Sequence, residues 1–242
     1  METKLFVYVL IGVFVAILIV CLSIASFAGA HVFEKYKYYN NFMSSSFTVA
    51  GDFCCMVSQR YLDCTVKIVK RGGELTDAYV PSQKTVFLSE NTFGNSSVAS
   101  LAIAGHELGH AYQDYLDPKL FERHNFYKVL CKVLGFLTYP LFFAGIILLF
   151  ASQSLLPSFL CVAGAILIFL FALFLKFATI KIEKDASKKA LVFLRELDVL
   201  DEVELEYARK FLNAALLTYI ADFLQAILGW TGLTRKTKIF GG

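Results

Sequence analysis

Two long uncharged stretches dominate the hydropathy pattern of the chain. The first runs from Leu5 to Ala30 and the second from Val133 to Leu175, and neither contains an Asp, Glu, Lys or Arg. A helix rises about 1.5 Å per residue, so the first stretch can cross roughly 30 Å of hydrocarbon once. The second is long enough to cross twice if the chain turns near Gln153-Ser154 and Pro157-Ser158. The pattern therefore predicts an N-terminal anchor followed by a transmembrane hairpin.

A cleaved signal peptide is the alternative to an anchor at the N-terminus. Ala28-Gly29-Ala30 has the small residues of a cleavage site. The apolar run before it, however, is much longer than the roughly 7–15 residues of a typical signal-peptide core. The only basic residue before that run, Lys4, is also opposed by Glu2. We therefore expect an uncleaved anchor.

Between the two apolar stretches the pattern changes to that of a small α+β region. Alternating residues predict a strand at Cys64–Val69, and Lys84–Leu88 predicts a second strand. The second strand is either internal to a sheet or an edge to which an extended peptide could add. Apolar positions at helical spacing then predict a helix that begins after a cap at Ser96 or Ser97 and runs to about Tyr115.

Two further helices are predicted after the hairpin. A charged helix runs from Thr179 to about Leu197 and continues out of the last span, and an apolar helix runs from Leu205 to Trp230. The apolar helix contains one acidic residue, Asp222, beyond its first turns. It could pack on the catalytic region, lie at the membrane interface or insert, since one buried acid makes insertion costly without excluding it.

Composition and charge agree with a membrane protein. Hydrophobic residues make up 57% of the chain and the mean hydropathy is +0.60, too apolar for a typical soluble protein. The net charge of +3 is too small to suggest nucleic-acid binding. The six cysteines form no CxxC pair, which argues against a disulfide scaffold and against a thiolate zinc site.

Basic residues flank the predicted spans almost entirely on one side, and the other side has only Lys4. They follow the first span, precede the hairpin and follow it again, whereas the hairpin turn carries no charge. The positive-inside rule therefore places residues 31–132 and the region after 176 in the cytoplasm, with the N-terminus outside. The lysines concerned are Lys35, Lys37, Lys128, Lys132, Lys176, Lys181, Lys184, Lys188 and Lys189.

The helix predicted before Tyr115 carries His106-Glu107-Leu108-Gly109-His110. Residues four apart face the same side of a helix, so His106 and His110 can bind one metal ion with Glu107 beside it. Zinc at a hydrolytic site takes three protein ligands and keeps a position for water, whose pKa falls to about 7. On so apolar a helix, these polar side chains would be poorly satisfied without a common partner. We predict bound Zn²⁺ with Glu107 as the general base.

The third zinc ligand must come from elsewhere in the chain, and a carboxylate is a usual choice. His31 abuts the first span, and His124 lies beyond Pro118, which should end the motif helix, so neither histidine is expected at the site. Glu183 and Asp185 lie on the helix that leaves the hairpin, and antiparallel spans would bring that helix back to the motif. From the residues alone, both carboxylates remain candidates.

Stabilisation of the tetrahedral oxyanion would need a further donor. Tyr112, Asn213 and Tyr219 offer phenol or amide groups, although aromatic residues on helices more often serve in packing.

From Gly73 to about Gln225, the chain resembles the bacterial membrane-embedded neutral zinc metallopeptidases of the YugP-like family. In wider outline it is similar to the gluzincin membrane proteases, in which Glu-x-x-Ala-Asp supplies the third ligand. The resemblance implies that Glu183 is this ligand, and Ser187 stands where those relatives carry Asp. The segments that carry it are Leu75-Thr76-Asp77, Lys84–Ser89, Ala104–Gln113, Glu183–Ser187 and Asn213–Tyr219.

Together these features predict an α-helical integral membrane protein with a small α+β gluzincin-like catalytic core. We expect an anchor at 1–30, a cytoplasmic catalytic region at 31–132, a two-span hairpin at 133–177 and a helical region at 178–242 that supplies the third ligand. The expected function is a zinc metalloendopeptidase of the bacterial plasma membrane that acts on peptides or membrane proteins. A metal-binding pseudo-protease that serves as a membrane scaffold or chaperone is the alternative, although it would not need Glu107.

Overall fold

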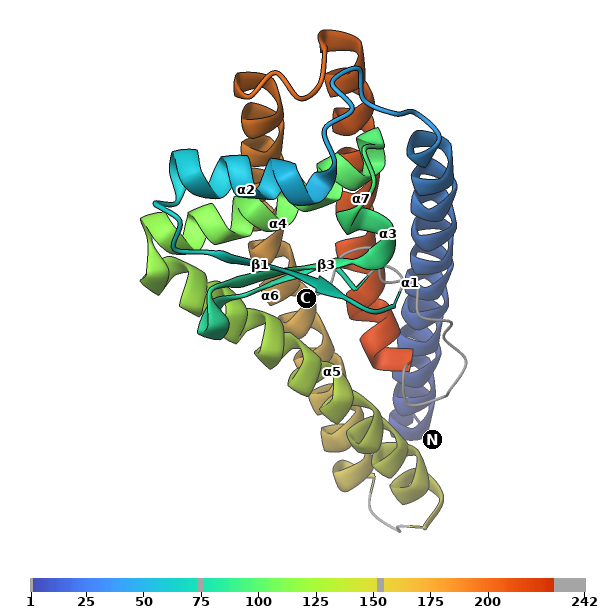
Figure 1. The fold of residues 1–242 in the computed structure, drawn as a ribbon. Helices are drawn as coiled ribbons and strands as arrows, with labels where there is room; N and C mark the ends of the chain where they lie inside the picture. Colours follow the sequence, from blue (N-terminus) through green and yellow to red (C-terminus); the bar gives the residue numbers. More distant parts are fainter. Residues whose placement is uncertain (1, 74–75, 152–154, 229–242) are drawn as a thin grey trace. The chain divides into compact units, whose positions relative to one another are not determined.

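The computed structural model describes residues 2–73, 76–151 and 155–228, and these residues are mainly helical (Figure 1). The elements in chain order are α1 (Glu2–Asn40), α2 (Ala50–Tyr61), β1 (Lys67–Arg71), β2 (Ala78–Val80), the 3-10 turn η1 (Pro81–Gln83), β3 (Thr85–Ser89), α3 (Glu90–Phe93), α4 (Val98–Leu116), α5 (Pro118–Ala151), α6 (Leu156–Glu196) and α7 (Glu202–Leu228).

Three of the described helices are long and apolar enough to cross a membrane, namely α1 from Leu5 onward, α5 and α6. This confirms the three expected apolar helices, while the uncleaved anchor and the transmembrane hairpin stay predictions. The break between α5 and α6 falls between Ala151 and Leu156, where it was expected, and Gln153-Ser154 lies outside the described residues. Helix α1 continues to Asn40 instead of ending near Ala30, because Val32 and Tyr39 lie on one face and are buried in a core.

The chain forms two compact units, and each combines segments that are distant in sequence. One unit holds α1 up to Phe27 together with Phe126–Thr179. The other holds Ala28–Asn125 together with Ile180–Tyr219. The residues predicted to bind metal all belong to the second unit, so its packing determines their geometry.

Aromatic rings and one close helix approach hold the first unit together. Phe14 of α1 is fully buried, with its ring centroid 4.7 Å from that of Phe142 and 5.6 Å from that of Phe169. The Ser158 hydroxyl of α6 donates a hydrogen bond of 2.7 Å to the Gly145 carbonyl of α5. A polar side chain is thus satisfied at the beginning of α6, where water would be scarce inside a membrane.

The sheet of the second unit has the strand order β1-β3-β2. Strand β3 pairs with β1 in parallel and with β2 in antiparallel orientation, so it is the internal strand. Of the two interpretations of Lys84–Leu88, the internal strand is right and the substrate-binding edge is wrong. The strand predicted at Cys64–Val69 is present as β1, shifted toward the C-terminus. Strand β2 was not predicted, because three residues are too few to show an alternating pattern.

Helix α4 is the centre of the second unit's core. It contacts α2 as well as strands β2 and β3 (Figure 1). Its apolar residues Leu101, Ile103 and Leu108 are completely buried. The helix begins as predicted, since the Ser97 side chain accepts a hydrogen bond of 3.2 Å from the backbone N–H of Ser100. It also ends as predicted, one residue before Asp117.

Candidate metal centre

The two motif histidines lie one turn apart on α4 with their rings close together. Their ring centroids are 4.7 Å apart, and His106 and His110 are only 1% and 5% exposed. Burial lowers the pKa of His106 below its ordinary value. The neutral imidazole that results is the form that binds a metal ion.

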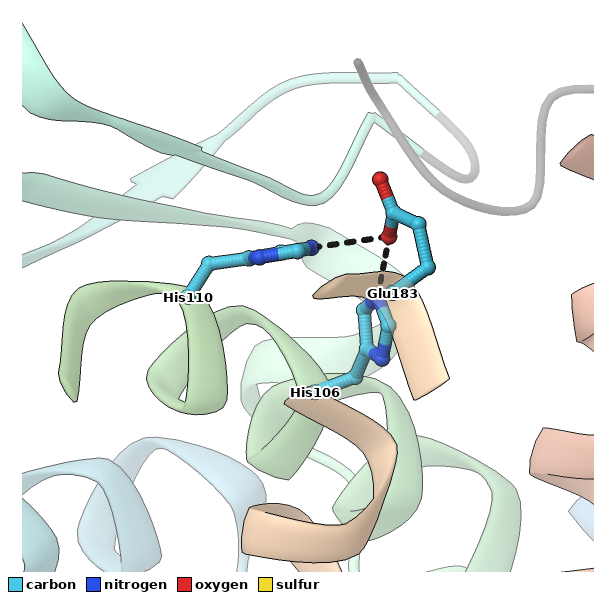
Figure 2. A group of neighbouring side chains, drawn as sticks. All are labelled: His106, His110 and Glu183. Atoms are coloured by element: carbon cyan, nitrogen blue, oxygen red, sulfur yellow. Dashed lines mark hydrogen bonds and ion pairs between the residues drawn. The ribbon is translucent and has the colours of Figure 1, made fainter. Parts of the chain in front are cut away.

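Glu183 of α6 meets both imidazoles through one oxygen atom (Figure 2). Its Oε2 lies 3.0 Å from the Nε2 of His110 and 3.5 Å from the Nε2 of His106, and the side chain is completely buried. One potential ligand atom from each residue lies within 4.8 Å of the other two. Two imidazole nitrogens and one carboxylate oxygen are the donor set of many hydrolytic zinc sites, so the residues present fit this metal.

Ser187 fixes the orientation of the His106 ring. The Ser187 Oγ lies 3.1 Å from the Nδ1 of His106, and its hydroxyl donates to the backbone carbonyl of Glu183 at 3.2 Å. Because this hydroxyl proton is used, Ser187 accepts the proton of Nδ1, which leaves the Nε2 lone pair facing Glu183. The serine therefore makes the supporting contact at the position where the resemblance to gluzincin membrane proteases leads one to expect Asp.

Gln113 supports His110 in the same way. Its Oε1 lies 2.9 Å from the Nδ1 of His110, and its amide donates to the Ile182 carbonyl and to an Asp185 carboxylate oxygen, each at 2.8 Å. The amide thus links the motif helix to α6. Asp185, the other carboxylate considered as a ligand, contacts Gln113 and Lys189, and Glu183 is the carboxylate that meets the histidines.

Two glycines of α4 allow the close helix contact that brings Glu183 to the histidines. A Cβ atom on Gly109 would lie 2.4 Å from the carbonyl oxygen of Ala186. One turn earlier, a Cβ atom on Gly105 would lie 3.0 Å from the Cβ of Ala190. Small residues therefore face each other on α4 and α6 over two turns. The backbone of α6 approaches so closely that the Glu183 side chain reaches the motif.

Glu107 is held at the other side of the motif by strand β2. Its Oε2 accepts a hydrogen bond of 2.7 Å from the backbone N–H of Tyr79, and the residue is buried. The Tyr79 hydroxyl donates to Asp114 at 2.5 Å, and the Lys84 ammonium lies 2.6 Å from the same carboxylate oxygen. These contacts fix the short strand along α4, so that the Glu107 carboxylate has a defined position next to the histidines.

His124 also lies at this centre, and the expectation that Pro118 would keep it away is wrong. Its Nε2 is 3.3 Å from the Oε1 of Glu183, and its ring stacks on that of His110 with the centroids 6.2 Å apart. Pro118 ends α4 but also begins α5, and Asp117 caps the new helix by accepting from the Leu120 N–H at 3.0 Å. The second turn of α5 then places His124 beside the cluster.

The structure does not support the residues suggested for oxyanion stabilisation. Tyr112 packs on the rings of Tyr61 and Phe193, which supports its assignment to the core. Asn213 is exposed, and the side chain of Tyr219 lies outside the described residues.

Two cavities are each lined in part by Phe121, whose ring lies 5.6 Å from that of His110. One has a volume of about 490 Å³ and is lined in part by Pro81, Lys84 and Asp114. The other has a volume of about 340 Å³ and is lined in part by Gln113 and Ile182. Neither cavity is lined by His106, His110 or Glu183, and Phe121 is the residue that links both cavities to the cluster.

Comparisons with known proteins agree with this chemistry. The sequence model of a family described as "Putative neutral zinc metallopeptidase" matches residues 13–235, a range that contains the whole cluster. "Putative membrane protease YugP" of Bacillus subtilis (strain 168) is 28% identical over 219 residues, which cover 88% of this chain and 92% of the relative. No solved structure matches the chain, so the gluzincin-like character of the core stays a prediction.

Proposed function

From the premise that this chain belongs to the family of neutral zinc metallopeptidases, we propose that it is a membrane-bound zinc metalloendopeptidase with His106, His110 and Glu183 as the metal ligands. The observation that carries the proposal is that these three side chains, from two different helices, are buried and lie close together, with Glu107 next to His106. Such a cluster is costly to bury unless its members share a partner. A zinc ion is the partner that matches the donor set.

The residues around the metal have separate tasks in peptide hydrolysis. Bound zinc would lower the pKa of a water molecule to about 7 and polarise the peptide carbonyl. Glu107, oriented by the Tyr79 N–H, would accept the proton of that water and deliver it to the leaving amine. Ser187 and Gln113 keep the Nε2 atoms of the two histidines directed at the ion.

Strand β2 is the element best placed to bind an extended substrate. It lies at the edge of the described sheet, and the Tyr79 N–H points to Glu107 rather than to β3. A peptide beside this edge could donate to the Tyr79 carbonyl, whereas the Tyr79 N–H stays with Glu107, and the peptide would pass next to the general base. We propose peptides or membrane proteins as substrates, because the site belongs to a chain with three apolar helices long enough to span a membrane. A pseudo-protease would not require Glu107, so this alternative is less well supported.

We also propose that the metal centre faces the cytoplasm, on the basis of the lysines that flank the apolar helices. Cys55 and Cys64 are exposed and lie in the same unit as the centre, whereas Cys54 is buried. A membrane-impermeant maleimide should therefore label these two cysteines only after intact cells are opened. A Cys55→Ser/Cys64→Ser variant gives the background signal. Full labelling of Cys64 in intact cells would place the centre outside.

Zinc content tests the proposed ligand set directly. Detergent-purified wild type should contain about one zinc per chain, and His110→Ala or Glu183→Ala should lose most of it, because three ligands are needed for tight binding. Asp185→Asn is the matched control, since it removes a neighbouring charge that lies outside the ligand set and keeps an oxygen that can accept from the Gln113 amide. Metal analysis of each protein would decide. Wild type that holds no zinc, even after zinc is added back, would contradict the proposal.

A further inference from the structure

We infer that His124 is a positioning residue for Glu183. The His124 ring holds Oε1 of the Glu183 carboxylate, so that only Oε2 faces the two motif histidines. This inference rests on the proposed function, in which Glu183 binds zinc. It assigns a role to a third histidine that the HExxH pattern does not include.

The two oxygens of Glu183 face different partners. Oε2 lies 3.0 Å and 3.5 Å from the Nε2 atoms of His110 and His106, whereas Oε1 lies 3.3 Å from the Nε2 of His124. His124 Nε2 and Glu183 Oε1 are close enough for an ion pair but do not meet hydrogen-bond geometry in this conformation, so one of the two side chains must rotate to form the bond. His124 therefore lies at the carboxylate oxygen that the two motif histidines do not share.

The position of His124 is fixed by its surroundings. The residue is 1% exposed, and its ring is inclined by 24° to that of His110. Phe121, one turn earlier on α5, lies 5.9 Å from the His124 ring and also packs on His110 and Tyr79. A side chain enclosed in this way has few alternative rotamers, so its contact with Glu183 is built into the fold.

A hydrogen bond to Oε1 would have a specific consequence for metal binding. A carboxylate can bind zinc through one oxygen or through both, and a partner on the second oxygen favours the first arrangement. It also restrains the rotation of the Glu183 side chain before the metal arrives. Loss of such a partner typically lowers metal affinity by about 10- to 100-fold.

Two other roles for His124 make different predictions. As a fourth metal ligand it would close the coordination position that a hydrolytic site keeps for water. The potential ligand atoms that lie within 4.8 Å of one another belong to His106, His110 and Glu183. His124 instead lies beside the other oxygen of the Glu183 carboxylate. As a packing residue only, it would be replaceable by another aromatic ring without any effect on the metal.

The test compares His124→Phe with His124→Gln in the full chain purified in detergent. Phenylalanine keeps the ring stacked on His110 but has no N–H, whereas glutamine provides an amide donor of similar reach. We expect the zinc affinity, measured by competition with a chelating dye, to fall by about 10- to 100-fold in His124→Phe and to recover largely in His124→Gln. The visible spectrum of the cobalt-substituted protein should become weaker in His124→Phe, as the coordination number rises with a two-oxygen carboxylate.

A double variant shows whether His124 acts through Glu183. In a Glu183→Gln background, His124→Phe should cause little further loss of zinc affinity, because the carboxylate that it positions is already gone. An additive loss would overturn the inference in favour of direct ligation. Wild-type zinc affinity and an unchanged cobalt spectrum in His124→Phe would overturn it in favour of packing.

Folding defects and failure of the proposed function can be distinguished from these outcomes. Thermal unfolding of the metal-free variants reports on the fold alone, and His124→Leu replaces His124→Phe if the phenyl ring is not accommodated. Wild type that binds no zinc would overturn the proposed function and this inference together. Wild type that binds zinc beside an unaffected His124→Phe would overturn this inference only.

Discussion

Glu107→Gln is expected to reduce peptide hydrolysis by about 10²- to 10⁴-fold while the protein retains its zinc. Glutamine has nearly the same shape, and its carbonyl oxygen can still accept from the Tyr79 N–H, but it cannot accept the proton of the attacking water. Cleavage of a fluorogenic peptide library by the detergent-purified protein, together with zinc analysis of the same sample, measures both quantities.

Glu90→Gln provides the control for this loss, because it removes one exposed carboxylate in the same unit, beside Lys70. It should retain both zinc and activity. Wild-type hydrolysis by Glu107→Gln would remove Glu107 from the chemistry. Bound zinc without hydrolysis of any library peptide by wild type would favour the pseudo-protease alternative.

The features that the sequence predicted well depend on local or strongly periodic signals. The apolar helices follow from long runs of uncharged residues, and the start of α4 follows from one capping serine, Ser97. The pairing of His106 with His110 follows from helix geometry, because residues four apart on a helix share a face. None of these features depends on which distant segment lies beside them.

The sheet was predicted less well because strand order depends on contacts between distant residues. The Lys84–Leu88 segment shows that a strand forms, but its pattern does not show that β1 and β2 flank it on both sides. Helix α2 was not predicted, although its buried residues Ala50, Phe53, Cys54 and Val57 recur at helical spacing.

The proposed third ligand, Glu183, and His124 show the same limit at the site. Glu183 and Asp185 are two residues apart on one helix, so the crossing of α4 and α6 decides which of them faces the histidines. The sequence alone does not give that crossing. A signal for the position of His124 is present in the sequence, because Asp117-Pro118 is a helix start as well as a helix end.

Gly109→Ala is expected to remove most zinc binding although Gly109 contacts no metal. The new Cβ would lie 2.4 Å from the carbonyl oxygen of Ala186 and 2.9 Å from its carbonyl carbon and its Cα. These are backbone atoms, so no side-chain rotation relieves the overlap and α6 must move. Ala186 is three residues from Glu183, so the same movement draws the carboxylate away from His106 and His110.

Gly105→Ala, one turn away on the same face of α4, is the matched control for Gly109→Ala. Its Cβ would meet the Cβ of Ala190 at 3.0 Å, an overlap that a small shift can relieve. Overpacking in a helix contact costs about 1–3 kcal/mol. In Gly109→Ala, where the overlap displaces a proposed ligand, this cost corresponds to a roughly 5- to 150-fold lower zinc affinity. We therefore expect a large loss of zinc in Gly109→Ala, and in Gly105→Ala a lower unfolding temperature with near-normal zinc affinity. Chelator competition and thermal unfolding distinguish the two effects. A folded Gly109→Ala protein with wild-type affinity would show that the close approach of α6 does not position Glu183.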